Sequence, residues 1–156
     1  MSDLQVKVNE FLSQRRVAVA GVSRGENGAG AGNLIYRKFR DSGYETFAIN
    51  PRADEVEGVP CYHTLKEIPG GVDAVVVAAP PKAAEELVRE CDELGIQFVW
   101  MHRGMGPGSV SSTAADYCEA HGINVIAGAC PLMYLHPDLG HKCIRWVHGV
   151  LGKLPD

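Results

Sequence analysis

Long apolar runs, cysteine pairs and an excess of basic residues are all missing from this sequence. No apolar run approaches the ~20 residues that a membrane-spanning helix needs, and the N-terminal segment MSDLQVKVNEF lacks the apolar core of a secretory signal. The cysteines number 5 and form no CxxC pair, which favours a reduced, cytoplasmic protein over a disulfide scaffold. The formal net charge of -4 argues against a broad face for binding nucleic acid.

Recognisable catalytic motifs are also missing. The sequence contains neither a GxSxG nucleophile elbow nor the lysine signature of a P-loop. Of the 6 histidines, His102 is expected at a strand end and is the best candidate for acid or base chemistry, although a ligand hydrogen bond or solvent exposure fits it better. We therefore predict no catalytic residue in this chain.

Cys130, in the segment GACP, is interpreted as a small buried core residue rather than a nucleophile. It could be grouped with His136, His141 and Cys143, but the spacing of these residues matches no standard zinc pattern. We therefore predict no metal site.

What the sequence does contain is a regular alternation of strand and helix patterns. Apolar segments predict buried strands at 16–21, 45–50, 73–80, 96–101 and 123–128. Apolar residues at helical spacing predict helices with these inner faces: Leu4, Val8, Phe11 and Leu12; Leu34, Ile35 and Phe39; Ala84, Leu87, Val88 and Cys91; Ala114, Cys118 and His121. A short extended piece and a helical turn are expected within 59–69, and a final amphipathic helix within about 138–152. This order predicts a doubly wound parallel α/β sheet of about five strands with helices on both faces.

The 156 residues suggest a single domain spanning 1–156. Ser2-x-x-Gln5 is a capping pattern for the first helix, Pro81 suits the first turn of a later one, and Gly43 and Gly95 are placed to end helices. In a doubly wound sheet, ligands bind beyond the carboxyl ends of the strands. The loops that follow the five strands are therefore the candidate site.

A glycine-rich segment, VAVAGVSRGENGAGAGN at 17–33, follows the first predicted strand. Free backbone N–H groups at the start of a helix attract a phosphate, and glycines let the backbone approach it closely. The GxGxxG dinucleotide fingerprint fits only partly at 21–26, and Gly28, Gly30 and Gly32 come later at the wrong spacing. The segment predicts a phosphate-binding loop, with a plain flexible loop as the alternative.

The end of the second predicted strand reads INPR and has no carboxylate. An NAD site usually places Asp or Glu there, to accept hydrogen bonds from the ribose. Arg52 instead suits an additional phosphate, which NADP carries at the ribose 2′ position and coenzyme A at the 3′ position. A solvated arginine in a turn is the alternative.

Together, VAVAGVSR, INPR, the proline after VVVAA and the late GACP resemble the CoA-binding domain family. Its members are small Rossmann-like proteins, similar to the N-terminal domain of the succinyl-CoA synthetase α subunit. The resemblance covers a core of about residues 11–135. The phosphohistidine domain of the synthetase has no counterpart in this chain.

The resemblance implies which residues contact CoA, segment by segment. The implied cofactor-binding residues are Gly21, Val22, Ser23, Arg24, Asn50, Pro51, Arg52, Ala79, Pro80, Lys82, Met101 and His102. Arg52 stands where the family usually has lysine. Lys82 stands near a position that is often arginine or phenylalanine, and His102 falls in a turn where glutamine or glutamate before glycine is common.

The resemblance implies a cytoplasmic protein that binds CoA or an acyl-CoA without catalysing a reaction, as a sensor, store or delivery protein. Three alternatives remain. One is an NADP-binding enzyme or redox sensor, and another is an accessory domain that works beside an acyl-CoA synthetase subunit. The third is an interaction module with a vestigial nucleotide site. The sequence does not define a protein partner or an oligomeric state.

Overall fold

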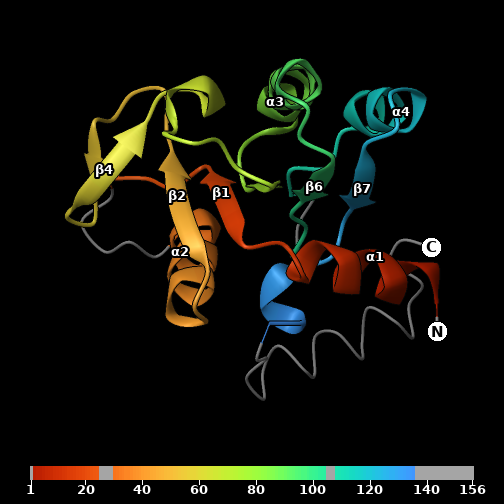
Figure 1. Cartoon of the computed structure of the whole chain (residues 1–156), viewed down its shortest axis with the longest axis horizontal. Coiled ribbons are helices and arrows are strands. Elements are labelled where there is room, and N and C mark those ends of the chain that lie inside the picture. The colour runs from red at the N-terminus through yellow and green to blue at the C-terminus, as the bar shows by residue number, and fades with distance from the viewer. Residues whose placement is uncertain (1, 25–29, 105–107, 136–156) are drawn as a thin grey trace.

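A seven-stranded sheet forms the centre of the computed structural model, which describes residues 2–24, 30–104 and 108–135 (Figure 1). The strands lie in the order β3-β4-β2-β1-β5-β6-β7. Their bounds are Arg16–Ala20 (β1), Glu45–Ile49 (β2), Glu55–Val56 (β3), Val59–Tyr62 (β4), Ala74–Val77 (β5), Phe98–Met101 (β6) and Asn124–Ala127 (β7). Neighbouring strands are parallel except β3, which pairs antiparallel with β4. The predicted doubly wound parallel sheet is therefore confirmed.

The five strands predicted from apolar runs are β1, β2, β5, β6 and β7. The extended piece expected within 59–69 is β4, which joins the sheet beside β2, and the helical turn is the 3-10 helix η1 at Leu65–Glu67. The sheet is wider than predicted because β4 brings β3 with it as a hairpin. Glu57 and Gly58 make the turn of that hairpin with φ of 52° and 77°, and a two-residue strand such as β3 is too short to show a period in the sequence.

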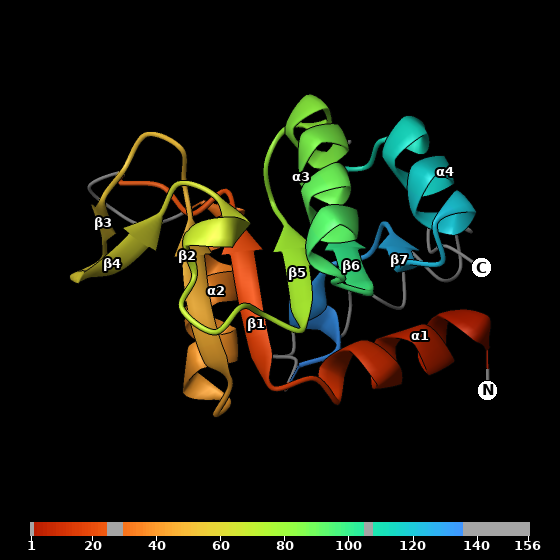
Figure 2. The ribbon, with the colours of Figure 1, turned by 45° about the horizontal axis from the view of Figure 1, so that its top comes forward.

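In the described part of the chain, four α-helices cover the sheet: α1 at Asp3–Leu12, α2 at Ala31–Asp41, α3 at Pro81–Leu94 and α4 at Ser112–Ala120. Figure 2 shows α3 in front of the sheet and α2 behind β1 and β2. A second 3-10 helix, η2 at Pro131–Met133, lies on the face of α1 and α2. None of the helices in the described ranges is long and apolar enough to cross a membrane.

The two faces of the sheet belong to two apolar clusters. In β1, Val17 and Val19 pack with α1 and α2, whereas Ala18 and Ala20 pack with α3 and α4. Successive side chains of a strand point to opposite faces, so a strand covered on both sides is apolar at every position. The continuous apolar runs in the sequence have this origin.

The predicted helix ends are largely confirmed. The Ser2 hydroxyl accepts a hydrogen bond from the backbone N–H of Gln5 at 3.2 Å, and Pro81 is the first residue of α3. Gly95 ends α3 in the left-handed region with φ of 74°. The helix predicted at 138–152 lies outside the described residues.

Two residues assigned to inner helix faces are exposed instead. Leu34 is 44% exposed, because the inner face of α2 is formed by Gly32, Ile35, Tyr36 and Phe39. His121 follows the last residue of α4 and is also exposed, with its ring stacked on Tyr117 at 3.9 Å between centroids. The helical period does not apply to His121 because the helix has already ended there.

Candidate functional site

A cleft of about 520 Å³ opens at the carboxyl ends of β1, β2 and β5. The chain leaves β1 to form β2 on one side, and β5 later joins β1 on the other side, so the cleft lies where the strand order reverses. In doubly wound sheets this switch point is the usual ligand site. Its lining residues are Ala20, Gly21, Val22, Ser23, Ile49, Asn50, Pro51, His63, Thr64, Ala78, Ala79, Pro80, Ala83, Glu86, Leu87 and Glu90.

The structure brings most of the sequence-predicted site residues together at this cleft. The predicted residues that line it are Gly21, Val22, Ser23, Asn50, Pro51, Ala79 and Pro80. Arg24, Arg52 and Lys82 follow the same loops and are exposed. Met101 and His102 are not among the lining residues, and Met101 is fully buried.

Gly21 and Gly32 allow the backbone of the first loop to pack closely. A Cβ on Gly21, whose φ is 100°, would lie 2.3 Å from the carbonyl oxygen of Ala78. A Cβ on Gly32 would lie 2.4 Å from the carbonyl oxygen of Gly21. A tight turn after β1 and close contact between helix and strand are the roles of the first and third glycines of the dinucleotide fingerprint. Gly21 and Gly32 fill both roles here, but they lie further apart in sequence than the glycines of GxGxxG, so that pattern does not detect them.

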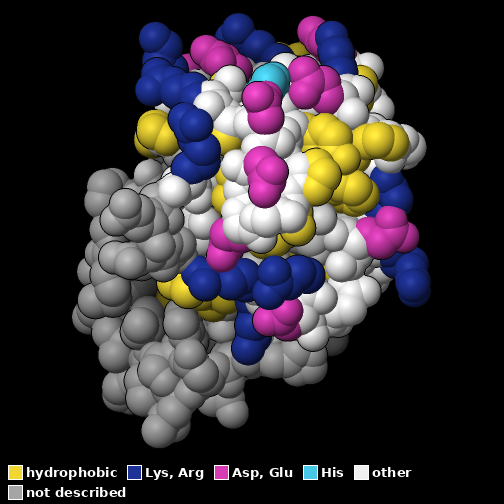
Figure 3. All heavy atoms as spheres, turned by 90° about the vertical axis from the view of Figure 1, so that its left-hand side faces the viewer, with side chains coloured by type: hydrophobic (Ala, Val, Ile, Leu, Met, Phe, Trp, Pro, Cys, Tyr) yellow, Lys and Arg dark blue, Asp and Glu magenta, His cyan; other side chains and the backbone are white. Residues whose placement is uncertain are grey.

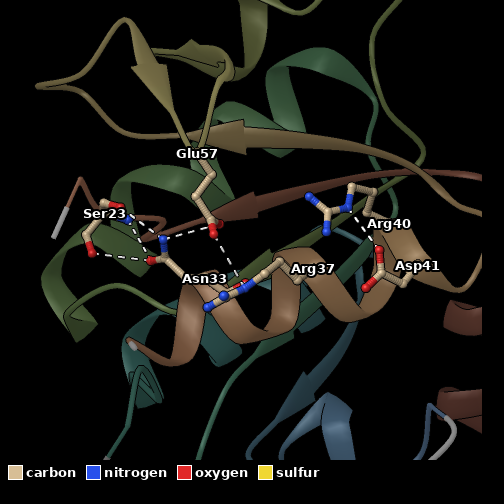
Figure 4. A network of polar contacts seen from close by, with 6 residues as sticks. All are labelled: Ser23, Asn33, Arg37, Arg40, Asp41 and Glu57. Atoms are coloured by element: carbon tan, nitrogen blue, oxygen red, sulfur yellow. Dashed lines mark hydrogen bonds and ion pairs between the residues drawn. The ribbon is translucent and has the colours of Figure 1, made fainter. Parts of the chain in front are cut away.

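Asn33 holds the first loop from inside the protein and is fully buried. Its Oδ1 accepts hydrogen bonds from the Ser23 backbone N–H at 2.9 Å and from Ser23 Oγ at 3.2 Å, and its Nδ2 donates to the Ser23 carbonyl at 2.9 Å (Figure 4). Asn33 is not among the site residues predicted from the sequence. The one signal in the sequence was a polar residue beside Gly32, on the side of a helix that also carries Tyr36.

Asn50 ties the second loop to the first. Its Nδ2 donates to the Val22 carbonyl at 2.8 Å, and its Oδ1 accepts from the backbone N–H of Arg52 at 2.9 Å. The second bond is the local side-chain turn that asparagine favours. Asn50 therefore shapes the cleft, because both ends of its amide are engaged within the protein.

Three basic residues are adjacent in sequence to residues that line the cleft. Arg24, Arg52 and Lys82 form no ion pair with another residue in the described ranges. The N-terminus of α2, capped by Gly30 without a side-chain hydrogen bond, adds backbone N–H groups and the positive end of a helix dipole. An anionic group is therefore favoured near these loops.

The wall of the cleft that α3 forms carries both apolar and acidic side chains. Ala83 and Leu87 of α3 line it, followed by Glu86 and Glu90. Glu90 is partly engaged, since its Oε1 accepts from the backbone N–H of Lys66 at 3.1 Å. A ligand that is anionic at one end and apolar along its length would match this distribution of charge.

The side of the molecule that carries the β3–β4 hairpin has no single sign of charge. Figure 3 shows basic, acidic and apolar side chains interspersed on this face. On the hairpin side of the cleft, His63 Nε2 lies 2.7 Å from Asp54 Oδ1. This mixed surface offers no continuous basic track for a nucleic-acid backbone.

His102 directly follows β6 and is not among the residues that line the cleft. Its backbone N–H donates to the Val77 carbonyl at 2.8 Å, and its own carbonyl accepts from the Ser109 N–H at 2.7 Å. Nδ1 is buried without a hydrogen-bond partner among the described residues, and burial lowers the pKa of the imidazole. The ring is therefore more strongly neutral than an exposed histidine at pH 7.

Cys130 is buried, as predicted, and 4% exposed. Burial raises the pKa of its thiol to about 11, against the smaller lowering effect of the backbone N–H groups of Leu132 and Met133. The turn before it is fixed by Trp100, whose Nε1 donates to the Gly128 carbonyl at 3.0 Å. The other residues considered for a metal site, His136, His141 and Cys143, lie outside the described residues, and the described ranges contain no metal-like cluster.

Comparison with known proteins agrees with this geometry. A family model described as "CoA binding domain" matches residues 15–136. The α subunit of an ADP-forming acetate–CoA ligase II from Pyrococcus furiosus is 32% identical over 90 residues. That match covers 57% of this chain but 19% of the ligase subunit, so the chain corresponds to about a fifth of that relative.

Two similar proteins are closer to this chain in size. The uncharacterized protein YneT of Bacillus subtilis is 28% identical over 127 residues, a match that covers 81% of this chain and 90% of YneT. A solved structure of a conserved hypothetical protein from Pyrococcus furiosus superposes with a TM-score of 0.62 and 30% identity, covering 74% of this chain and 92% of that one. Because the family model matches residues 15–136, which is most of this chain, the chain belongs to the CoA binding domain family.

Proposed function

We propose that this protein binds coenzyme A or an acyl-CoA and catalyses no reaction of its own, so that it senses, stores or delivers the thiol carrier. The observation that carries the proposal is the cleft at the β1–β5 switch point, flanked by three cations that lack ion-pair partners in the described ranges, in a chain of the CoA binding domain family.

The residues present suit the different parts of CoA. The Ser23 hydroxyl and the N-terminus of α2 offer hydrogen bonds and positive potential to the pyrophosphate. Arg52 is assigned to the ribose 3′-phosphate, and Ile49 and Leu87 supply apolar walls within the cleft. When bound, CoA would supply a thiol that carries acyl groups as thioesters. The protein would contribute binding and orientation.

A second candidate role is supported by the ligase relatives. The ADP-forming acetate–CoA ligase subunit matches this chain over a region equal to 19% of its own length. A separate chain with the same CoA-binding fold could therefore act as one component of an acyl-CoA synthetase. In that role the protein would hold CoA while other subunits carry out the chemistry.

Isothermal titration with CoA, dephospho-CoA, NADP and NAD tests the proposal. We expect CoA to bind most tightly, and dephospho-CoA to lose about 1–2 kcal/mol of binding free energy because it lacks the 3′-phosphate. An Arg52→Ala variant should remove this preference while binding dephospho-CoA as the wild type does.

Two results would reject the proposal, and a third would reject only the role assigned to Arg52. Tighter binding of NADP than of CoA would replace it with a dinucleotide-binding function. Equal affinity of the wild type for CoA and dephospho-CoA would remove the role assigned to Arg52, and no binding of either ligand would leave the cleft without the proposed function.

A further inference from the structure

The buried contact between Asn33 and Ser23 is one part of a longer polar network. Asn33 Nδ2 also lies 3.4 Å from Glu57 Oε2, in the turn of the β3–β4 hairpin. Glu57 Oε1 in turn lies 3.5 Å from Arg37 Nε, which donates to the Asn33 carbonyl at 3.3 Å. Figure 4 shows the Asn33 side chain between Ser23 and Glu57. The first loop and the β3–β4 hairpin thus meet at one asparagine of α2.

Because Asn33 is buried and its partners are partly buried, breaking these contacts would cost free energy. Asn33 is 0% exposed, and the side chains of Glu57 and Arg37 are 23% and 33% exposed. A buried amide that loses its partners costs free energy because no water replaces them. The network therefore favours one arrangement of the loop, the helix and the hairpin.

The network also determines what Ser23 can offer to a ligand. The Ser23 backbone N–H and carbonyl are both bonded to the Asn33 amide. A phosphate near Ser23 therefore cannot use that N–H while the contact is intact. The hydroxyl remains, because Ser23 Oγ can turn from Asn33 Oδ1, at 3.2 Å, toward the cleft that Ser23 lines.

We propose that Asn33 is a positioning residue that fixes Ser23 for the pyrophosphate of CoA, and that Glu57 steadies Asn33 from the β3–β4 hairpin. This inference rests on the proposed CoA-binding function. Asn33 itself touches no ligand in this scheme. It acts through Ser23, and Arg37 assists by holding the Glu57 carboxylate against α2.

The test uses Asn33→Asp, which keeps the shape and one acceptor but replaces the two donated hydrogen bonds by a carboxylate facing the Ser23 carbonyl and Glu57. Asn124→Asp is the matched control. The Nδ2 of Asn124 also donates to a glutamate, Glu10 Oε2, at 2.6 Å, but neither residue lines the cleft. The probes are CoA and adenosine 3′-monophosphate, which keeps the adenine, the ribose and the 3′-phosphate but has no pyrophosphate.

For Asn33→Asp we expect the affinity for CoA to fall about tenfold or more, with a change of less than about twofold for adenosine 3′-monophosphate. Hydrogen exchange followed by NMR should show faster exchange of the Ser23 amide, with the amides of β1 and β5 unchanged. Asn124→Asp should leave all three measurements at the wild-type level. Equal losses for both ligands, or unchanged CoA affinity with a freed Ser23 amide, would overturn the proposal.

Glu57→Ala provides a second arm if Asn33→Asp does not fold. Alanine keeps a non-glycine residue at the same backbone position and removes the carboxylate together with the Cγ methylene. We expect a loss of about threefold in CoA affinity and intermediate exchange at Ser23. Wild-type values in this variant would overturn the role of the hairpin. If the wild type itself fails to bind CoA, the proposed function fails, while the exchange measurement still reports whether Asn33 fixes Ser23.

Discussion

The carbonyl oxygen of Gly21 occupies the space that a side chain on Gly32 would need, 2.4 Å from the position of its Cβ. The first residue after β1 and the second residue of α2 are thus in direct backbone contact across the loop that joins them. This contact sets how closely α2 approaches the sheet, and with it the position of the N-terminus of the helix beside the cleft.

Gly32→Ala should destabilise the protein although alanine is the better helix former by about 1 kcal/mol. The added methyl group meets backbone rather than a movable side chain, so we expect a net loss of about 1–3 kcal/mol in the free energy of unfolding, measured by urea denaturation. Gly30→Ala is the control, because the nearest atoms to its Cβ are 3.7 and 3.8 Å away. Equal stability of Gly32→Ala and wild type would contradict the proposed packing role of this contact.

Alkaline pH should weaken the fold partly through Cys130. Its thiol has a pKa raised from 9.0 to about 11 in the folded protein, so folding favours the protonated form. The stabilising contribution is complete below pH 9 and is lost as the pH rises through about 11. Urea midpoints between these pH values should fall more steeply for the wild type than for Cys130→Ala. Parallel pH profiles would show that this thiol does not contribute.

Cys130 should also resist mixed-disulfide formation with CoA. Exchange requires an accessible thiolate, and this thiol is buried with a raised pKa. After treatment of the native protein with CoA disulfide at pH 7.5 (about one unit below an ordinary thiol pKa), peptide mapping by mass spectrometry should find no adduct at Cys130. Selective labelling there, reversible by dithiothreitol, would instead indicate a thiol-responsive site.

The purified protein should form no thioester when incubated with acetate or succinate, CoA and ATP or GTP. The reason is that, among the described residues that line the cleft, no hydroxyl is hydrogen-bonded to a histidine, and His102 is not a lining residue. The readout is the rate of thioester formation against a protein-free control. A steady, protein-dependent rate that His102→Ala abolishes would prove the proposed non-catalytic role wrong.

The sequence was most informative where one pattern dominates the local structure. The runs around Val75 and Val99 are apolar at every position because both faces of the sheet are covered, and they correctly predicted strands. The start of α3 at Pro81 and its end at Gly95 depend only on local backbone geometry, so both could also be predicted.

The parts of the site that depend on long-range contacts were harder to predict from the sequence. Gly32 and Asn33 owe their roles to Gly21 and Ser23 across the first loop, a pairing that no helical period reveals. His63 and Thr64 line the cleft because β4 joins the sheet beside β2, which brings the following loop to the same edge. Strand order had to be known before these residues could be assigned.

The anchoring of the first loop at both ends has a consequence for how the protein can be altered. Ser23 is bonded to Asn33 and Gly32 packs on Gly21, so contacts between described residues hold the two ends of the loop together. Lengthening a loop between fixed ends costs only about 0.6 kcal/mol per doubling. Peptides of different length could therefore be inserted between Arg24 and Gly30, beside the cleft, while the two anchoring contacts stay in place.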